Sequence, residues 1–266
     1  RVLSKVIRQS MKESGVTEEG VQFIDSIDRD LVDAMLGMRG SIDLMIPRGG
    51  SDFIRYVGET AQMPVVTGGI GVCHLYVDRS ADLSKACNIA FNAKVQRPTV
   101  CNALDSILVH SEVASDYLPN IVRDLSNAGV EVRCDDASLL ALKDLSSINV
   151  KPATEKDWGK EFLSLVISIR VVDSMDEALE HIESHGSGHT EAIITEDHSN
   201  AVRFLDEVDA AVVMVNASTR FTDGSELGLG SEVAISTNKM HARGPMGLRE
   251  LTSYKWTVLG DGHVRQ

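Results

Sequence analysis

The stretch from residue 162 to residue 218, FLSLVISIRVVDSMDEALEHIESHGSGHTEAIITEDHSNAVRFLDEVDAAVVMVNAS, alternates between apolar runs and amphipathic segments. Three runs are rich in Val and Ile and have the length of buried strands: residues 162–172, 190–197 and 210–218. The two segments between them, residues 174–186 and 199–208, have the apolar spacing of amphipathic helices. Strands that alternate with helices in this way are typical of a parallel sheet covered by helices, so we predict an α/β fold.

The same alternation continues towards both ends of the chain. Further predicted strands are residues 21–27, 41–47, 130–133 and one or two within 64–77, where a glycine pair interrupts the apolar run. Further predicted helices are residues 1–15, 28–38, 51–61, 80–94, 115–129 and 137–145. Gly15 would end the first helix, and Asp28 and Ser51 would cap the second and third. The last apolar run, residues 252–260, is predicted as an isolated strand.

Length, composition and charge narrow the class of protein. The chain has 266 residues, 43% of them hydrophobic, which is ordinary for a globular protein. Its formal net charge is −13 and no segment gathers basic residues, which argues against a nucleic-acid partner. No apolar run reaches the roughly 18 residues of a membrane span, and no signal peptide is visible at the start. We therefore expect a cytoplasmic protein without a membrane partner.

The four cysteines are expected to be free thiols. Their spacing does not match a zinc site, and a large cytosolic chain rarely uses a disulfide framework. Cys73 lies in an apolar strand and Cys87 on the apolar face of a helix, where core packing explains them. Cys134 precedes two aspartates, which would disfavour its thiolate.

Cys101 differs from the other three cysteines. It follows Lys94 and Arg97 in the segment NAKVQRPTVCN (92–102), and nearby cations lower the pKa of a thiol. We therefore predict that Cys101 is the candidate nucleophile. An inert loop cysteine is the alternative that these residues leave open.

Three loop segments are candidate binding sites. The junction IPRGGSDF (46–53) joins a strand end to a helix start and could hold an anion, although a plain turn would look the same. Arg220 follows a predicted strand in NASTRFTDG (216–224) and could bind a carboxylate or phosphate, or form a salt bridge. The glycine-rich segment 230–251 carries Lys239, His241, Arg243 and Arg249, and is predicted as a functional loop or a buried set of turns.

Several of these segments together resemble the γ-glutamyl phosphate reductase family, also called glutamate-5-semialdehyde dehydrogenases. They are PRGG (47–50), PVVTGGIGVCHLYVD (64–78), NAKVQRPTVCN (92–102), ESHGSGHTEAIITED (183–197), VNASTRFTDG (215–224) and HARGPMGLRELTSYKW (241–256). The resemblance runs from residue 1 to residue 266 without a gap. It implies an aldehyde-dehydrogenase-like fold with three-layer parallel α/β domains and the reduction of γ-glutamyl phosphate by NADPH in proline synthesis.

The resemblance also assigns roles to individual residues. The family's catalytic thiol corresponds to Cys101, which would form a thioester. Gly49 and Gly50 would lie close to the dinucleotide, and Glu161, in KEFLSL, would hold a cofactor ribose. Arg220, His241 and Arg243 are candidates for binding phosphate or the substrate's α-carboxylate. The implied domains are residues 1–76 (NADP-binding), 77–245 (catalytic) and 246–266 (oligomerisation strand), and no metal site is implied.

Two departures from the family pattern are informative. Hydrolytic aldehyde dehydrogenases have a water-activating glutamate two residues before the paired glycines, and that position is Val66 here. The opening part of the cofactor domain, with an asparagine that helps to stabilise the oxyanion, has no counterpart in these residues. A first helix without a capping residue also suggests that the chain begins inside a longer domain; trimmed upstream residues are the alternative.

The resemblance leaves partners and the parent protein open. The segment TSYKWTVLG (252–260) matches the strand with which aldehyde dehydrogenases pair subunits, so a homodimer or larger homo-oligomer is expected. A functional link to glutamate 5-kinase is also expected. The alternatives are the reductase part of a bifunctional proline-pathway synthase, and a folded fragment that assembles without catalysing a reaction.

Overall fold

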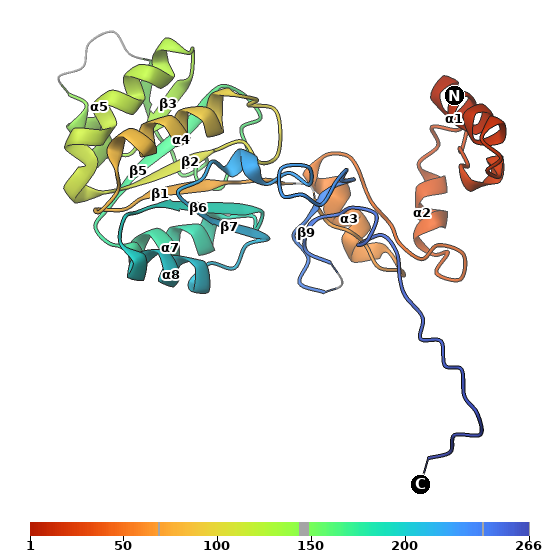
Figure 1. Ribbon diagram of the computed structural model, residues 1–266. Coiled ribbons are helices and arrows are strands. Elements are labelled where there is room, and N and C mark those ends of the chain that lie inside the picture. Colours follow the sequence, from red (N-terminus) through yellow and green to blue (C-terminus); the bar gives the residue numbers. More distant parts are fainter. Residues whose placement is uncertain (69, 144–148, 241, 266) are drawn as a thin grey trace. The chain divides into compact units, whose positions relative to one another are not determined.

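We describe the protein from a computed structural model, in which residues 1–68, 70–143, 149–240 and 242–265 are described (Figure 1). The chain divides into two compact units. The first unit comprises residues 1–45 and 59–65, and the second comprises residues 46–58 and 66–266.

The first unit is mainly helical. It contains α1 (Val2–Glu13), the short 3₁₀ helix η1 (Glu18–Gly20) and α2 (Asp30–Leu36). The predicted end of the first helix is confirmed, because Gly15 has a φ of +73°, a left-handed conformation that glycine adopts without strain. The cap of α2 is Arg29 rather than Asp28, whose carboxylate instead accepts the Asp30 N–H at 3.1 Å.

The two strands predicted in this unit, residues 21–27 and 41–47, are wrong. Residues 21–27 form no strand, and the only pairing near 41–47 among the described residues is one parallel bridge between Met45 and Val65. Phe23, Ile24 and Ile27 are all exposed. An alternating apolar pattern becomes a strand only when a neighbouring strand satisfies its backbone, and no described segment does so here.

The second unit is built on a seven-stranded sheet in which every pairing is parallel. Its strands are β1 (His74–Val77), β2 (Ser106–His110), β3 (Glu131–Cys134), β4 (Val150–Pro152), β5 (Val166–Val172), β6 (Thr190–Ile194) and β7 (Val212–Val215). Their order across the sheet is β4-β3-β5-β2-β1-β6-β7. The central strands β1, β2 and β6 are buried at every residue, as expected for a sheet covered on both faces.

Helices cover both faces of the sheet and confirm the predicted three-layer α/β fold. On one face lie α4 (Leu83–Val95), α5 (Ser111–Asn127) and α6 (Asp136–Ala141), and on the other lie α7 (Met175–His185) and α8 (His198–Glu207) (Figure 1). Alternate strand residues face the two layers, so that Leu75 and Val77 pack towards α4 and α5 whereas Tyr76 packs towards α7 and α8.

Most helices and strands predicted after residue 80 are confirmed within a few residues. Four strands were missed, β2, β4 and the two-residue strands β8 and β9, and residues 144–145 of the helix predicted at 137–145 lie outside the described residues. The remaining elements are α3 (Ser51–Thr60), η2 (Thr219–Phe221) and a two-stranded antiparallel pair, β8 (Ile235–Ser236) with β9 (Gly244–Pro245). α3 begins at Ser51, the residue that was predicted to cap it.

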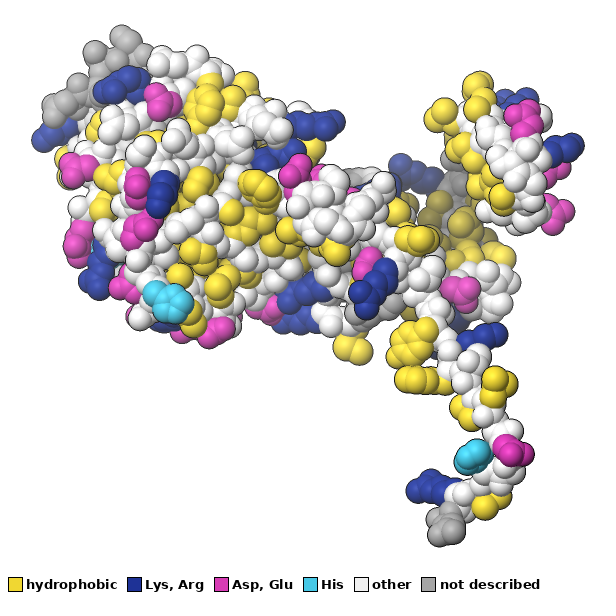
Figure 2. All heavy atoms as spheres, viewed as in Figure 1, with side chains coloured by type: hydrophobic (Ala, Val, Ile, Leu, Met, Phe, Trp, Pro, Cys, Tyr) yellow, Lys and Arg dark blue, Asp and Glu magenta, His cyan; other side chains and the backbone are white. Residues whose placement is uncertain are grey.

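The strand predicted at residues 252–260 is not formed in this chain. The segment is extended and carries no regular structure, and its apolar side chains are exposed, with Tyr254 85%, Trp256 88% and Val258 87% accessible. Figure 2 shows apolar side chains along the carboxyl-terminal segment. Among the described residues no helix is both long and apolar enough to cross a bilayer.

Candidate active site

Cys101 lies in the loop that joins α4 to β2, close to the amino ends of the two central strands. Cys73, the residue before β1, is fully buried, and its thiol donates to the backbone oxygen of Cys101 at 3.3 Å. Cys101 itself is half-buried. Of the four cysteines, which are all free, Cys101 and Cys87 are the two with partly accessible side chains.

Glycines allow the loops around Cys101 to approach one another. A Cβ on Gly71 would lie 1.8 Å from the Cys101 backbone oxygen, and a Cβ on Gly68 would lie 1.9 Å from the backbone oxygen of Ile235. Neither position has room for a side chain, because the obstacle in each case is backbone. Gly68 and Gly71 therefore allow β8 and the Cys101 loop to lie against the segment that enters β1.

Glu161 is held beside the same glycine. Its Oε1 accepts the Gly71 N–H at 2.9 Å, and its carboxylate raises the pKa of the Cys101 thiol. Burial raises the pKa of Glu161 itself, and the Gly71 hydrogen bond offsets part of this rise. The structure thus brings together two residues that the sequence assigned to catalysis and to cofactor binding.

The pKa of Cys101 is raised, and the expectation that local cations lower it is wrong. Burial is the main cause, and the carboxylates of Glu161 and Glu232 raise the pKa further. The backbone N–H of Cys101 and the positive charge of Arg48 act in the opposite direction. The thiol is therefore mainly protonated at neutral pH.

Lys94 fails to activate Cys101 because it points into the core instead. Its side chain is fully buried, with Nζ 3.6 Å from a carboxylate oxygen of Asp105. Burial lowers the pKa of Lys94 and raises that of Asp105 to about 6. Lys94 precedes Cys101 in the sequence, but its ammonium group pairs with the buried Asp105 and does not activate the thiol.

Arg220 is bonded to two residues of the loop that carries Cys101. Its Nε donates to Gln96 Oε1 at 2.7 Å, and its Nη1 donates to Asn102 Oδ1. Burial lowers the pKa of Arg220, and the carboxylate of Asp223 opposes this shift. Asn102 was missed at the sequence level, although it directly follows the cysteine in the motif.

The segment that carries Arg220 does not stay at the carboxyl end of its strand, as the sequence suggested. After β7 it turns back, so that Thr219 donates to the Asn102 backbone oxygen at 2.7 Å. Thr222 accepts from Thr190, the first residue of β6, at 2.9 Å. Arg220 therefore reaches the amino ends of the strands, where Cys101 lies.

Comparison with known proteins identifies the architecture. The aldehyde dehydrogenase family pattern matches residues 149–257. The chain is 56% identical over 264 residues to a γ-glutamyl phosphate reductase of Dehalococcoides mccartyi, covering 99% of this chain and 62% of that protein. A crystal structure of γ-glutamyl phosphate reductase from Thermotoga maritima is 50% identical, with a TM-score of 0.92 over 99% of this chain and 62% of the other. The fold is that of an aldehyde dehydrogenase.

The predicted resemblance to γ-glutamyl phosphate reductases is thereby confirmed. The chain spans about 62% of the length of these relatives. A more distant structure, an engineered glycolyl-CoA reductase with bound NADP⁺, is 15% identical and has a TM-score of 0.67 over 90% of this chain and 61% of that one. It shares the aldehyde dehydrogenase fold.

Within this fold, Val66 occupies a buried apolar position ahead of the glycines, only 3% exposed. No carboxylate is therefore supplied at residue 66. The carboxylates near the thiol come from Glu161 and Glu232 instead, and both are already engaged by backbone N–H groups. Glu232 accepts the Gly224 N–H at 2.9 Å, and nothing in its local sequence pattern distinguished it.

The remaining predicted residues differ in their surroundings. Gly49 and Gly50 form the turn into α3, and a Cβ on Gly50 would meet no atom within 4 Å, so this backbone is open. Arg243 donates to Asp209 Oδ1 at 2.7 Å and is held in an ion pair that Lys239 shares. His241 lies outside the described residues.

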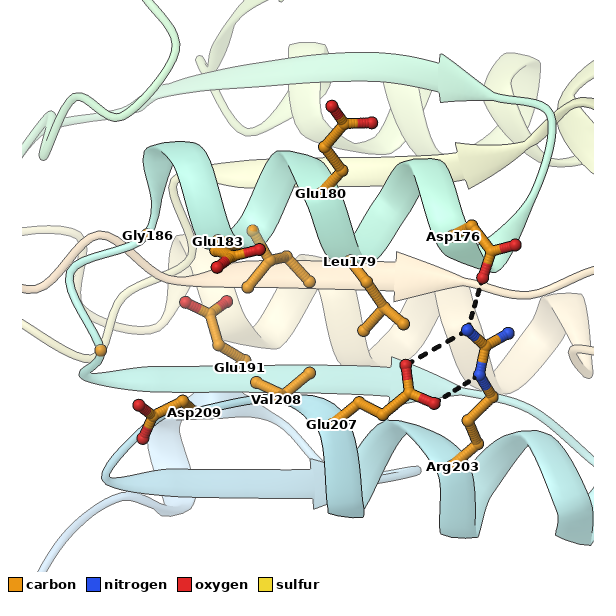
Figure 3. A pocket seen from close by; sticks show the side chains of 12 residues that line it. Asp176, Leu179, Glu180, Glu183, Gly186, Glu191, Arg203, Glu207, Val208 and Asp209 are labelled. Atoms are coloured by element: carbon orange, nitrogen blue, oxygen red, sulfur yellow. Dashed lines mark hydrogen bonds and ion pairs between the residues drawn. The ribbon is translucent and has the colours of Figure 1, made fainter.

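A separate acidic cavity of about 550 Å³ lies between α7 and α8, away from the thiol (Figure 3). Arg203 pairs there with Asp176 and with Glu207. Glu191 also lines the cavity, but its Oε2 faces inward and accepts the backbone N–H of His74 at 2.8 Å. Across the described ranges, no group of three or more His, Cys, Asp or Glu side chains is arranged to hold a metal ion.

Proposed function

We propose that this chain carries the catalytic thiol of an NADPH-dependent γ-glutamyl phosphate reductase, which forms glutamate-5-semialdehyde and phosphate in proline biosynthesis. The observation that carries this proposal is the half-buried Cys101 at the strand ends of a chain 56% identical to such a reductase. The proposal keeps the three expected domains: residues 1–76 for NADP binding, 77–245 for catalysis and 246–266 for oligomerisation.

Cys101 would act as the nucleophile. Its sulfur would bond to the γ-carbonyl carbon of the acyl phosphate, and the bond to the phosphate oxygen would break. The thiol proton would pass to the departing phosphate. The backbone N–H of Cys101 would donate to the developing oxyanion. The product of this step is a γ-glutamyl thioester on Cys101.

Val66 would protect this thioester from water. General-base catalysis is worth roughly 10²–10⁴-fold, and a buried valine supplies none. An acyl phosphate already has a good leaving group, so its attack by Cys101 needs no activated water. The thioester would therefore persist until it is reduced.

The residues present fit a nicotinamide dinucleotide. α3 starts directly after Gly49 and Gly50, where free backbone N–H groups and the open backbone of Gly50 suit a phosphate. The carboxylate of Glu161 lies beside the thiol and could accept a ribose hydroxyl. NADPH, when bound, would supply the hydride that reduces the thioester. The Cys101 thiolate would then leave and take up a proton.

Substrate binding would fall to cations near the thiol. Of the two described candidates, Arg220 is better placed than Arg243, because it donates a hydrogen bond to Asn102, the residue that follows Cys101. Arg243, paired with Asp209, and His241 remain candidates for binding phosphate or carboxylate. We also propose a homo-oligomer built through residues 252–260, a functional link to glutamate 5-kinase and a cytoplasmic location.

The function can be tested by following NADP⁺ reduction with glutamate-5-semialdehyde and phosphate. The assay should compare the 266-residue chain with a polypeptide extended at its amino terminus to the length of the relatives. We expect activity that depends on phosphate and is abolished in Cys101→Ser, with Cys87→Ser as the matched control.

Three outcomes would separate the possibilities. Activity only in the longer polypeptide would identify the 266-residue chain as a catalytically incomplete part. Full activity in Cys101→Ser would reject the nucleophile. No phosphate-dependent activity at either length would reject the proposed reaction.

A further inference from the structure

A small cavity of about 240 Å³ lies beside Arg220, on the side of the Cys101 loop. It is lined by Asn92, Gln96, Arg220, Phe221, Asp223, Ser225 and Glu226. Both signs of charge therefore meet in one cavity: the guanidinium of Arg220 and the carboxylates of Asp223 and Glu226. A ligand with only one charged group would leave one of these signs unmatched.

The proposed substrate carries both charges at the end that does not react. A γ-glutamyl group has an α-carboxylate and an α-ammonium on the same carbon. The α-amine is also a chemical hazard, because the neutral amine can attack the γ-carbonyl carbon. That attack forms a nitrogen–carbon bond, expels phosphate or the Cys101 thiolate, releases the amine proton and closes the five-membered ring of 5-oxoproline.

We propose that this cavity binds the α-amino-acid end of the substrate, with Arg220 on the α-carboxylate and Asp223 on the α-ammonium, and so prevents the amine from attacking the acyl group. The proposal rests on the proposed function of Cys101. It adds a specificity residue, Asp223, and a second consequence of binding: suppression of a side reaction.

The local contacts of Arg220 leave it able to bind a carboxylate. Nε and Nη1 are used by Gln96 and Asn102, which fix the plane of the guanidinium. Nη2 donates to no described residue, so one face of the fork remains for a ligand. Arg220 is bonded to Asn102, the residue that follows Cys101, and Gln96 of the loop that carries Cys101 lines the cavity.

Asp223 is preorganised to receive a cation. Its Oδ1 accepts the backbone N–H of Ser225 at 2.9 Å and the more distant N–H of Glu226 at 3.4 Å. Oδ2 accepts no hydrogen bond from a described residue. Hydrogen bonds from Ser225 lower the pKa of Asp223, and Arg220 lowers it further, so the carboxylate stays charged at neutral pH.

A charged Asp223 has two effects on the bound substrate. It discriminates in favour of a substrate with an α-ammonium over the same chain with hydrogen at that carbon. It also favours the protonated amine, which has no lone pair with which to attack the thioester. Loss of a charged hydrogen bond at such a site corresponds to roughly 10- to 100-fold in discrimination.

The first test compares glutamate-5-semialdehyde with 5-oxopentanoate, which lacks the amino group. The active polypeptide would oxidise each aldehyde with NADP⁺ and phosphate, and the open-chain concentration of each would be measured by NMR. We expect kcat/KM to favour the amino aldehyde by roughly 10- to 100-fold. Asp223→Asn should remove most of this ratio, whereas Asp206→Asn, an exposed aspartate on α8, should keep it.

The second test measures the side reaction directly. γ-Glutamyl phosphate would be generated in situ by a kinase, and 5-oxoproline would be counted per semialdehyde formed, after subtraction of the reaction without reductase. We expect the fraction of 5-oxoproline to rise in Asp223→Asn and to stay unchanged in Asp206→Asn. Because a slower reductase alone leaves more acyl phosphate to cyclise, the fractions would be compared at protein concentrations that give equal rates of semialdehyde formation. At equal rates, a merely structural role of Asp223 would leave this fraction unchanged.

The outcomes distinguish this proposal from the function on which it rests. If the unmodified polypeptide oxidises neither aldehyde, the proposed function fails. If it oxidises both with equal kcat/KM, or if Asp223→Asn keeps both the preference and the low 5-oxoproline fraction, the α-ammonium site is rejected and the reductase function stands.

Discussion

At the scale of the residue, the environment of Cys101 favours the thiol over the thiolate. Burial and two carboxylates, Glu161 and Glu232, outweigh the influence of Arg48. Cys73 and Cys134 are fully buried, and burial raises the pKa of Cys87 to about 11. Access of a reagent to the partly exposed Cys101 side chain therefore favours its reaction, whereas the raised pKa lowers the fraction of reactive thiolate.

Alkylation with iodoacetamide should follow this order. We expect Cys101 to be modified first, Cys87 more slowly, and Cys73 and Cys134 only on unfolding. Because the pKa of Cys101 is raised, its rate should still increase above pH 8.5, the usual pKa of a free cysteine. Peptide mass spectrometry measures both properties; a rate that levels off near pH 7, or equal labelling of all four thiols, would contradict them.

The buried His189 should make the stability of the fold depend on pH. It is buried beside Thr190, and burial lowers its pKa to about 4, whereas an unfolded histidine titrates near 6.5. Between pH 6.5 and pH 4 the unfolded chain therefore binds a proton at this histidine and the folded chain does not. The stability present above pH 6.5 is lost as the pH falls towards 4.

The variant His189→Asn isolates this contribution. Its free energy of unfolding in urea, measured from pH 7 to pH 4.5, should fall less steeply than that of the unmodified chain. The difference should approach about 1.4 kcal/mol per pH unit, the value for one proton. Parallel curves for the two proteins would show that His189 is not buried as a neutral group.

At the scale of the element, the turn that enters β1 depends on contact between backbones. A side chain on Gly71 would overlap the Cys101 backbone oxygen. We expect Gly71→Ala to displace the Cys101 loop and to reduce both the melting temperature and the rate of thioester formation. Gly40→Ala is the control, since a Cβ there meets no atom within 4 Å. Equal melting temperatures and rates in the two variants would contradict the close approach.

The sequence predicted those helices and strands whose own residues show a regular spacing of apolar side chains. Helices α4, α7 and α8 and strands β5, β6 and β7 follow from apolar spacing, and the structure adds the caps Ser174 and Asp197. The strand β4 is only three residues long, and its existence depends on pairing with β3, which no local pattern encodes. Residues 21–27 failed for the converse reason: they have the pattern of a strand but no partner.

The candidate site was predicted only in part, for a related reason. Cys101 and Glu161 were found through motifs, and the structure joins them through Gly71. The orientation of Lys94 and the return of the Arg220 segment to the amino ends are properties of the packed sheet. Asn102 and Glu232 contribute through contacts between distant parts of the chain, and the spacing of residues along the sequence does not reveal such contacts.

At the scale of the whole molecule, residues 252–260 offer an exposed apolar segment for self-association. Tyr254, Trp256 and Val258 alternate along the segment and are almost fully exposed. Such a segment can pair with a sheet edge of a second copy. We expect deletion of residues 252–266 to lower the mass in solution towards that of one chain, measured by light scattering. Deletion of residues 262–266 is the control, and unchanged mass in the longer deletion would reject the role.

The peptide unit of Gly71 has one further consequence. Its N–H points at Glu161 and its Cα at the backbone of Cys101, so a single amide proton sits between the two halves of the site. Acylation of the thiol or engagement of Glu161 by a ribose would alter the field at that proton. In a ¹⁵N-labelled sample, the Gly71 resonance would serve as a built-in spectroscopic indicator of occupancy, readable without any turnover.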